Sequence, residues 1–590
     1  MSKWHRLLPD TGHLQEQAVF PLILLIVLFG AIDAWAGLGS YVGGDSVSYM
    51  DMAKGVAGGR LAAAVSGYWS PLYPLILSMF IRFVEPDAGK EFVVVRVVNF
   101  LIFLVTLGVF HVFLKRFLDR ASRQAPAGDA SCVPLARWQL EIAAWAAFIW
   151  ACFSLNQVSR VRTDGCVIAV VFASLAMLLS LGEGKTSSAR FIGFGVLLGI
   201  GYWVKTVLLP LGFVFLIAAL IEPAVWRVRR RLLLSAAALV MVATPLIVAI
   251  SLKYGKLSYG ESGVLNYAWM VNRVKPYWHW QGGPPGNGSP VHASSLIFRN
   301  PDAFAFGTPI VATYAPWYDP AYWYEGVKIR FAWAEQLSTL RRETRRLTGI
   351  LRVWAFLVPG VIFVLSLCVW RYFASLAKGL REFVSLWIVA VAGVGIYLFV
   401  FVEARYVASY LCLVLLLLVG AVRISAGRLN RAIGTGVALL CLLATFLTCG
   451  PRLASAAELL IQKRGHVHDG EWRVADAFVA LGVKPGTPVA VIRGDVNDVN
   501  NVWARIALLR VVAEIPKRQG VRLPSGNLAF WTSRPALQEA VLQAFAQNGA
   551  RFAVANDVPQ WADTRGWSHI PHSVFFYRAL EPAAVDLNSR

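Results

Sequence analysis

Two aspartates follow the first long apolar run of this chain. Asp45 and Asp51 lie in the segment YVGGDSVSYMDMAKGVAGG, residues 41–59. A carboxylate can take the proton of an attacking hydroxyl group, and it can also bind a divalent cation. At a boundary between membrane and water, such a group is either a solvated loop residue or a reactive group that serves a lipid-borne substrate. The other charged residues of the chain bear on this choice.

More ionisable residues stand at the ends of apolar runs. Such residues are costly in or near a membrane span and tend to be functional, although a single one often only anchors a helix end. Arginine and lysine can bind a phosphate or pyrophosphate leaving group, and a carboxylate can accept a proton from an acceptor hydroxyl. The set therefore suits group transfer from a lipid-linked phosphate donor. Its members are Arg96, Arg160, Arg162, Asp164, Lys205, Glu403 and Arg405.

The composition is that of a membrane protein. Of 590 residues, 57% are hydrophobic and 15% are charged, whereas soluble domains have about 45–50% apolar and about 25% charged residues. Long apolar runs recur, which predicts a polytopic α-helical membrane protein. The first run, residues 18–38, contains Asp33 and no clear cleavage site, so we interpret it as a retained span. The seven cysteines lie mostly in apolar runs without metal-ligand spacing and are interpreted as small buried hydrophobic residues.

The basic residues predict the orientation of the spans. The net charge is +22, and the basic residues cluster in short loops between apolar runs. Basic residues that set the orientation of membrane spans have this distribution, so the charge does not indicate nucleic-acid binding. With a cytoplasmic N-terminus, nearly every short basic loop lies inside the cell. Residues 68–84 are apolar but short and carry Pro71 and Pro74, so we expect them on the outer membrane face. About eleven transmembrane helices remain, at 18–38, 92–114, 138–155, 165–182, 190–204, 206–221, 231–252, 350–370, 382–402, 405–422 and 430–449.

This topology leaves three large outer regions, residues 39–91, 253–349 and 450–590. The middle region contains WYDPAYW, in which Trp317 and Asp319 are candidates for contact with a sugar or a lipid phosphate. The alternative interpretation of these aromatic residues is a belt at the membrane interface.

The last outer region has the composition of a separate domain. VADAFVALGV is typical of an amphipathic helix, and PVAVIRG and ARFAVAND are typical of strands. Alternating helices and strands predict a small α/β domain. We therefore expect a membrane module at residues 1–449 and a periplasmic α/β domain at residues 450–590, in a multi-pass protein of a bacterial inner membrane.

Several short motifs, in their order along the chain, resemble those of the membrane-embedded GT-C glycosyltransferases. The resemblance is with the branch of protein O-mannosyltransferases and lipid A aminoarabinose transferases, from about residue 18 to about residue 425. Many relatives have Asp-Glu at the first motif, whereas Ser46 replaces the glutamate here. The matching residues are Asp45, Tyr49 and Ala53 in GDSVSYMDMA, residues 70–74 (SPLYP), Arg162 and Asp164 in VRTDG, Val204-Lys205, and Arg405-Tyr406.

The resemblance implies a GT-C fold and a single inverting sugar transfer. The donor would be a polyprenyl-phosphate sugar, and the acceptor a hydroxyl group of a protein, lipid or glycan. Asp45 would act as general base, and Asp164 would orient the acceptor or hold Mg²⁺ or Mn²⁺ together with Asp45; the two carboxylates leave the metal requirement open. Lys205, Arg405 and Arg162 would hold the donor phosphate, while Tyr49, Asp51, Tyr406, Glu403, Trp317 and Asp319 would contact the substrates.

Two other functions use the same residues. A transporter or flippase of a lipid-linked or anionic substrate would also place arginine, lysine and aspartate in the membrane, although the chain shows no inverted repeat. A non-catalytic scaffold of an envelope polysaccharide complex is compatible with the loss of the glutamate at Ser46. A new covalent product distinguishes the transferase from both.

Overall fold

The computed structural model divides the chain into two compact units. Unit 1 comprises Met1–Gly37, Arg96–Pro245 and Gln336–Gly465, and unit 2 comprises Leu38–Val95, Leu246–Glu335 and His466–Arg590. The structure describes residues 11–36, 44–85, 91–123, 133–274, 294–307, 326–369, 380–424, 428–461, 470–492, 502–516, 526–556 and 558–580.

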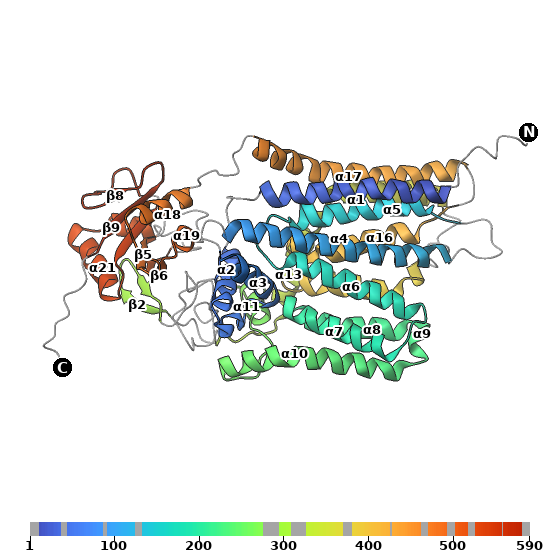
Figure 1. The fold of residues 1–590 in the computed structure, drawn as a ribbon, viewed down its shortest axis with the longest axis horizontal. Helices are drawn as coiled ribbons and strands as arrows, with labels where there is room; N and C mark the ends of the chain where they lie inside the picture. The colour runs from blue at the N-terminus through green and yellow to red at the C-terminus, as the bar shows by residue number, and fades with distance from the viewer. Residues whose placement is uncertain are drawn as a thin grey trace, which may run out of the picture. The chain divides into compact units, whose positions relative to one another are not determined.

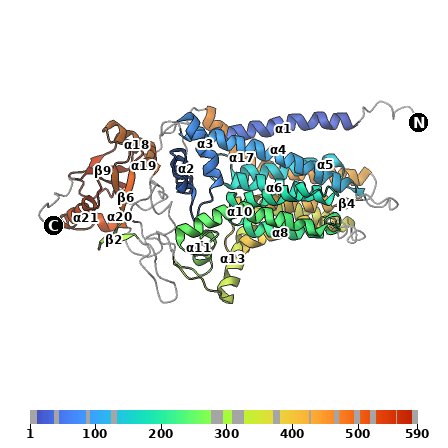
Figure 2. The same cartoon turned by 60° about the horizontal axis from the view of Figure 1, so that its bottom comes forward.

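In its described residues, unit 1 is helical (Figure 1), apart from one short antiparallel pair of strands, β1 (Val133–Pro134) and β4 (Arg423–Ile424). In Figures 1 and 2, α4, α5 and α6 run next to one another along the bundle. The helices that lie wholly or mostly in this unit are α1 (Thr11–Ala36), α4 (Glu91–Arg123), α5 (Arg137–Ile149) with its π-helical extension η3 (Trp150–Asn156), α6 (Asp164–Gly182), α7 (Ser188–Val204), α8 (Leu208–Ile221), α9 (Pro223–Trp226), η4 (Arg229–Arg231), α10 (Leu232–Tyr254), α13 (Trp333–Val369), α15 (Val384–Leu398), α16 (Ala404–Ala421) and α17 (Arg428–Ile461).

Every predicted membrane span coincides with a helix of the structure. Among the described residues, six helices are long and apolar enough to cross a membrane, and five shorter apolar helices accompany them. The chain is therefore a polytopic α-helical membrane protein. The total of eleven transmembrane helices stays a prediction, as does the outer-face position of α3 (Leu72–Val84), which is one of the shorter apolar helices.

Glycine allows two helices of unit 1 to approach closely. A Cβ atom built on Gly195 of α7 would lie 2.1 Å from the backbone oxygen of Ser235 in α10. The hydroxyl of Ser235 donates a hydrogen bond to the backbone oxygen of Phe191, one turn earlier in α7 (2.7 Å). Because backbone atoms cannot move aside as a flexible side chain can, this crossing requires glycine at position 195.

Unit 2 contains a seven-stranded sheet in the order β2-β3-β6-β5-β7-β9-β8. Its centre is parallel, with β5 (Pro488–Ile492) between β6 (Arg510–Ile515) and β7 (Phe552–Asn556), and the outer pairs are antiparallel. The strands predicted at PVAVIRG and ARFAVAND are confirmed as β5 and β7, and the predicted helix is confirmed as α18 (Gly470–Ala480). The remaining strands are β2 (Ser295–Phe298), β3 (Ala303–Ala305), β8 (Ser568–His569) and β9 (Phe575–Ala579).

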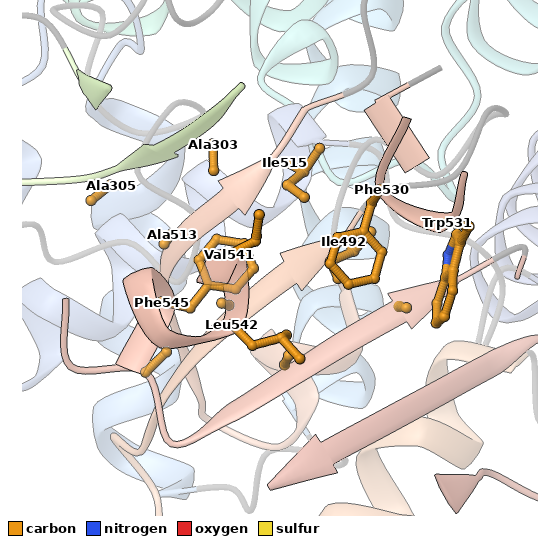
Figure 3. Packing of buried hydrophobic residues seen from close by; sticks show 14 residues of the cluster. Ala303, Ala305, Ile492, Ala513, Ile515, Phe530, Trp531, Val541, Leu542 and Phe545 are labelled. Atoms are coloured by element: carbon orange, nitrogen blue, oxygen red, sulfur yellow. The ribbon is translucent and has the colours of Figure 1, made fainter. Parts of the chain in front are cut away.

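The sheet also recruits strands from outside residues 450–590. The hairpin of β2 and β3 belongs to the middle outer region, and β3 pairs with β6 through Phe304 and Glu514. Helices α20 (Gly526–Trp531) and α21 (Pro535–Gln547) contribute to the hydrophobic core on this sheet. Figure 3 shows Phe530, Trp531, Val541, Leu542 and Phe545 packed over small strand residues such as Ala303 and Ala513. The α/β fold is therefore built from two distant parts of the chain.

A buried ionic cluster joins this α/β part to the first outer region within unit 2. The guanidinium group of Arg505, in α19 (Val502–Ile506), lies 2.5 Å from Asp51 Oδ1 in α2 (Gly44–Ala57) and 2.7 Å from Glu91 Oε2 at the start of α4. Lys54 Nζ lies 2.9 Å from the other oxygen of Glu91. Burial lowers the pKa of Arg505, but the charges of Asp51 and Glu91 raise it above its ordinary value. Arg505 therefore stays charged and holds both carboxylates.

Removal of the Arg505 guanidinium leaves two buried carboxylates without their main counter-charge. Breaking a buried ion pair on one side costs about 3–5 kcal/mol. We therefore expect Arg505→Met to lower the thermal unfolding temperature of the purified full-length protein sharply. The control is Arg565→Met, because Arg565 forms an exposed ion pair with Asp563 and such pairs contribute little. Equal unfolding temperatures for the two variants would contradict a structural role for Arg505.

The close crossing of α7 and α10 gives a second prediction. Gly195→Ala forces a methyl group against a backbone oxygen, and overpacking of this kind costs about 1–3 kcal/mol. Gly436→Ala in α17 is the matched control, because a Cβ atom at that position meets nothing within 4 Å. In detergent, the thermal unfolding temperature should be lower than that of wild type for Gly195→Ala and unchanged for Gly436→Ala. A stable Gly195→Ala protein would mean that the two helices separate without cost.

Candidate functional site

Three charged residues of unit 1 meet where three helices begin or end. Asp164 is the first residue of α6, Lys205 directly follows α7, and Arg405 lies in the first turn of α16. Lys205 Nζ donates a hydrogen bond of 2.7 Å to Asp164 Oδ1, and Arg405 Nη1 lies 3.6 Å from Asp164 Oδ2. Asp164 is buried, whereas the side chains of Lys205 and Arg405 are 21% and 15% exposed to solvent. One buried carboxylate thus holds two cations that remain accessible.

Aromatic rings and a second carboxylate complete this cluster. Lys205 Nζ lies 3.8 Å from the centre of the Tyr406 ring, which in turn stacks on Tyr397 at 5.3 Å. Arg405 Nη2 donates to the Tyr406 hydroxyl (3.2 Å), and Arg405 Nε lies 2.5 Å from Glu403 Oε2. A cation above an aromatic face is stabilised without losing its charge. Tyr406 and Glu403 therefore fix the directions of the two cations.

The local structure explains why these side chains converge. Lys205 has extended backbone after the last turn of α7, so its side chain leaves the helical path. The hydroxyl of Thr163, the residue before α6, donates to the backbone oxygen of Val204 (2.9 Å) and ties the two chain segments together. Both α6 and α16 present their N-termini at this cluster. The positive ends of helix dipoles favour anions there.

Arg162 and Arg160 lie in the turn before α6. Arg162 Nη2 donates to the backbone oxygen of Asn156 (3.0 Å), and its charge acts on Asp164 from nearby. Arg160 is exposed and its Nε donates to Gln157 Oε1 (2.8 Å). Arg96 is buried in α4. Of the basic residues selected from the sequence, Lys205 and Arg405 thus form ion pairs with Asp164.

The first-motif residues lie on helix α2 in unit 2. Asp45 is in the first turn of this helix and is half-buried. Tyr49 follows four residues later and so shares its face, whereas Asp51 is rotated from Asp45 by about 240° at 3.6 residues per turn. Asp51 accordingly points to Arg505. Its carboxylate is part of the structural ionic cluster rather than of the face that carries Asp45.

An aromatic loop covers Tyr49. Its ring packs edge-on against Trp69 at 5.4 Å and against Tyr73 of α3 at 5.5 Å. The hydroxyl of Ser66 accepts hydrogen bonds from the backbone N–H groups of Tyr68 and Trp69 (both 3.2 Å), which shapes the turn before SPLYP. Tyr49 of the motif Asp-x-x-x-Tyr and Tyr73 of the proline-containing helix are thus packed together.

Residues from the middle outer region support this loop, although no sequence motif indicates them. Tyr254, at the end of α10, accepts a hydrogen bond from the backbone N–H of Gly67 (3.2 Å), and Lys253 donates to the backbone oxygen of Val65 (2.8 Å). A Cβ atom on Gly67 would lie 3.0 Å from the Tyr254 ring. These contacts join segments 187 residues apart in the sequence. A spacing pattern cannot reveal such a pairing.

Two of the predicted contacts lie outside the described residues, namely Trp317 and Asp319. The proposed metal pair of Asp45 and Asp164 is divided between the two units. Within the part of the chain that the structure describes, no group of three or more His, Cys, Asp or Glu residues has an arrangement that could hold a metal ion. Binding of Mg²⁺ or Mn²⁺ by Asp45 and Asp164 stays a prediction.

The comparisons with known proteins concern the fold. No family model matches the sequence, and no curated protein matches it. The crystal structure of ArnT from Cupriavidus metallidurans in the apo state matches with a TM-score of 0.50 at 12% identity, over 96% of this chain and 99% of that one. ArnT bound to undecaprenyl phosphate matches with a TM-score of 0.49 at 12% identity, over 95% and 98%.

An oligosaccharyltransferase from Archaeoglobus fulgidus, in complex with Zn and sulfate, matches with a TM-score of 0.43 at 12% identity, over 90% of this chain and 68% of that one. A structural match at this level of sequence identity is informative about the fold alone. The match to the apo ArnT structure extends over nearly the whole of both chains. The chain therefore has the GT-C fold of ArnT, a lipid A aminoarabinose transferase, as its short motifs predicted.

Proposed function

We propose that the protein is an inverting glycosyltransferase. It moves a sugar from a polyprenyl-phosphate donor to an acceptor hydroxyl at the outer face of a bacterial inner membrane. The observation that carries this proposal is the Asp164–Lys205–Arg405 cluster, which places two accessible cations at the ends of apolar helices. The GT-C fold supports it, because ArnT, of the same fold, has been crystallised with undecaprenyl phosphate.

The cluster has the properties of a phosphate site. Lys205 and Arg405 share two carboxylates, Asp164 and Glu403. The nearby Arg162 adds a third positive charge, so three cations face two carboxylates and a net positive charge remains toward an incoming anion. The exposed part of Arg405 offers N–H donors in a planar fork, and Lys205 offers a compact ammonium group, two forms that both bind phosphate oxygens. The N-termini of α6 and α16 add a positive electrostatic potential at the same place. A sugar phosphate that leaves as an anion is stabilised by this arrangement.

The geometry favours different roles for the two candidate catalytic carboxylates. Both oxygens of Asp164 face cations, so this residue is poorly suited to accept a proton and is assigned the positioning of Lys205 and Arg405. Asp45 lies in the first turn of α2, beside a buried tyrosine on the same face. We assign the general base to Asp45 and the shaping of its surroundings to Tyr49.

The proposed step balances without a redox partner. Asp45 takes the proton of the acceptor hydroxyl while the hydroxyl oxygen forms a bond to the anomeric carbon of the donor sugar. The bond from that carbon to the phosphate oxygen breaks on the opposite side, and its electron pair leaves with the polyprenyl phosphate. Lys205 and Arg405 stabilise the phosphate anion that results. Attack opposite the leaving group inverts the anomeric configuration.

The other outer parts receive roles that follow from their contacts. Asp51 anchors α2 to the α/β part through Arg505, so we assign it to structure in place of substrate contact. Tyr406 and Glu403 orient the cations at the donor phosphate. We place the α/β part in the periplasm, on the basic-loop pattern of the sequence.

Replacement of Asp45 tests the base. General-base catalysis contributes about 10²–10⁴-fold to a rate, so Asp45→Asn should lower transfer by that factor in membranes saturated with donor, while donor retention stays unchanged. Asp45→Glu should restore part of the rate. The matched control is Ser46→Ala at the neighbouring position. Full transfer activity in Asp45→Asn would exclude Asp45 as base, and substrate crossing sealed vesicles without a new covalent product would favour a transporter.

Replacement of the cations tests the phosphate site. A hydrogen bond to a charged group is worth about 1.5–3 kcal/mol, so Lys205→Ala and Arg405→Ala should each retain about ten- to a hundredfold less polyprenyl-phosphate sugar than wild type. Mass spectrometry of lipid bound to gently purified protein measures this and identifies the sugar. Arg160→Ala, which removes an exposed arginine of the same region, should retain donor as wild type does. Bulk phospholipid alone in all samples would refute this donor class.

A further inference from the structure

A second lipid-facing feature lies on the bundle of unit 1, away from the charged cluster. A groove of about 480 Å³ opens between α4, α6 and α7, within the size range of about 300–1,000 Å³ of small-molecule sites. Its walls are apolar and mostly small, with Val105, Gly108 and Val112 on α4, Ala173 and Ala176 on α6, and Leu197 on α7.

The residue sizes on the two sides of α4 and α6 explain why the groove exists. On the buried side, Phe172 of α6 packs against Phe110 and Phe113 of α4, with ring centres 4.9 and 5.1 Å apart. These rings hold the two helices at a distance. On the adjoining side, which faces the groove, a Cβ atom at Gly108 would meet nothing within 4 Å, and alanines line the groove on α6. Small side chains cannot fill a space that three phenylalanines keep open.

One end of the groove is basic. Arg116 lines it there, together with Ser180. Arg116 Nη1 lies 3.5 Å from Glu183 Oε2, and Lys185 Nζ lies 3.2 Å from the same oxygen. Lys115, next to Arg116, is exposed. Two basic side chains thus share one carboxylate, which leaves a positive charge at the mouth of an apolar channel.

The groove has the length of one membrane leaflet. From Val105 to Arg116, α4 rises by about 16 Å at 1.5 Å per residue, and half of a ~30 Å hydrocarbon core is about 15 Å. Ser180 lies sixteen residues beyond Asp164 on α6, a rise of about 24 Å. The basic mouth is therefore at the opposite end of α6 from the proposed donor site, on the side that the basic loops assign to the cytoplasm.

We propose that this groove binds one anionic phospholipid of the inner leaflet. One acyl chain lies along Gly108, Ala173 and Ala176, and the phosphate of the headgroup contacts Arg116 and Lys185. An acyl chain that fills the groove makes dispersion contacts with the helices that an empty space would forfeit. The positive charge at the mouth favours an anionic headgroup over a zwitterionic one. The site is independent of the sugar-transfer proposal, because it uses none of the same residues.

The test uses full-length protein in nanodiscs with equal amounts of palmitoyl-oleoyl phosphatidylglycerol and phosphatidylcholine. After mild delipidation, native mass spectrometry counts the lipids that remain. Wild type should retain one phosphatidylglycerol at least fivefold more often than phosphatidylcholine. Gly108→Phe should reduce this retention at least tenfold, because the ring fills the groove. Met241→Phe is the control, since Met241 is an exposed residue of α10 outside the groove.

Two further variants make the result decisive. Arg116→Gln combined with Lys185→Gln should keep the lipid but lose the preference for phosphatidylglycerol. Ala173→Leu fills the same channel from α6 and replaces Gly108→Phe if that variant unfolds at a lower temperature. The proposal is overturned if groove-filling variants retain phosphatidylglycerol as wild type does, if the two headgroups are retained equally by wild type, or if the retained molecule is a polyprenyl phosphate.

Discussion

The requirement that a charge in an apolar interior must have a partner governs this structure. Asp164 satisfies it with Lys205 and Arg405, and Arg505 satisfies it with Asp51 and Glu91. The two clusters differ in one respect. In the first, the buried carboxylate of Asp164 is shared by two cations that keep some exposure, and Glu403 and Arg162 lie close by. In the second, the buried cation of Arg505 is shared by two buried carboxylates, and Lys54 binds one of them. Three cations against two carboxylates leave the first cluster a positive charge for an anion, whereas the charges of the second are balanced and it acts as a brace.

Side-chain size determines how closely neighbouring helices of the bundle approach each other. Glycine at position 195 lets α7 and α10 touch through backbone atoms, while the phenylalanines of α4 and α6 keep those two helices apart. A tight crossing and an open groove therefore occur in the same bundle. Since no water is present in a bilayer to drive helices together, such differences in shape decide which helices pack on each other and which leave room for lipid.

The sequence predicted the apolar helices of the bundle well, because each is a long apolar run that stands out from its surroundings. It also predicted Asp164, Lys205 and Arg405 as a group, because ionisable residues stand out in apolar surroundings. It did not predict the partner of Asp51. Arg505 is more than 400 residues away, and a single arginine in a polar region carries no signal of its own. The short strands β2 and β3 were also missed, since three or four residues are too few for a periodic pattern.

The pairing of β3 with β6 has a consequence for biosynthesis. The hairpin that contains β3 leaves the ribosome roughly 200 residues before its partner strand, and the segments between them include α13, α15, α16 and α17. At about 5–20 residues per second, the delay is on the order of 10–40 s. During that time the edge of β3 lacks its partner strand while the helices between the two strands are still being made. The pairing of β3 with β6 therefore takes place only after the helices of the bundle have been synthesised.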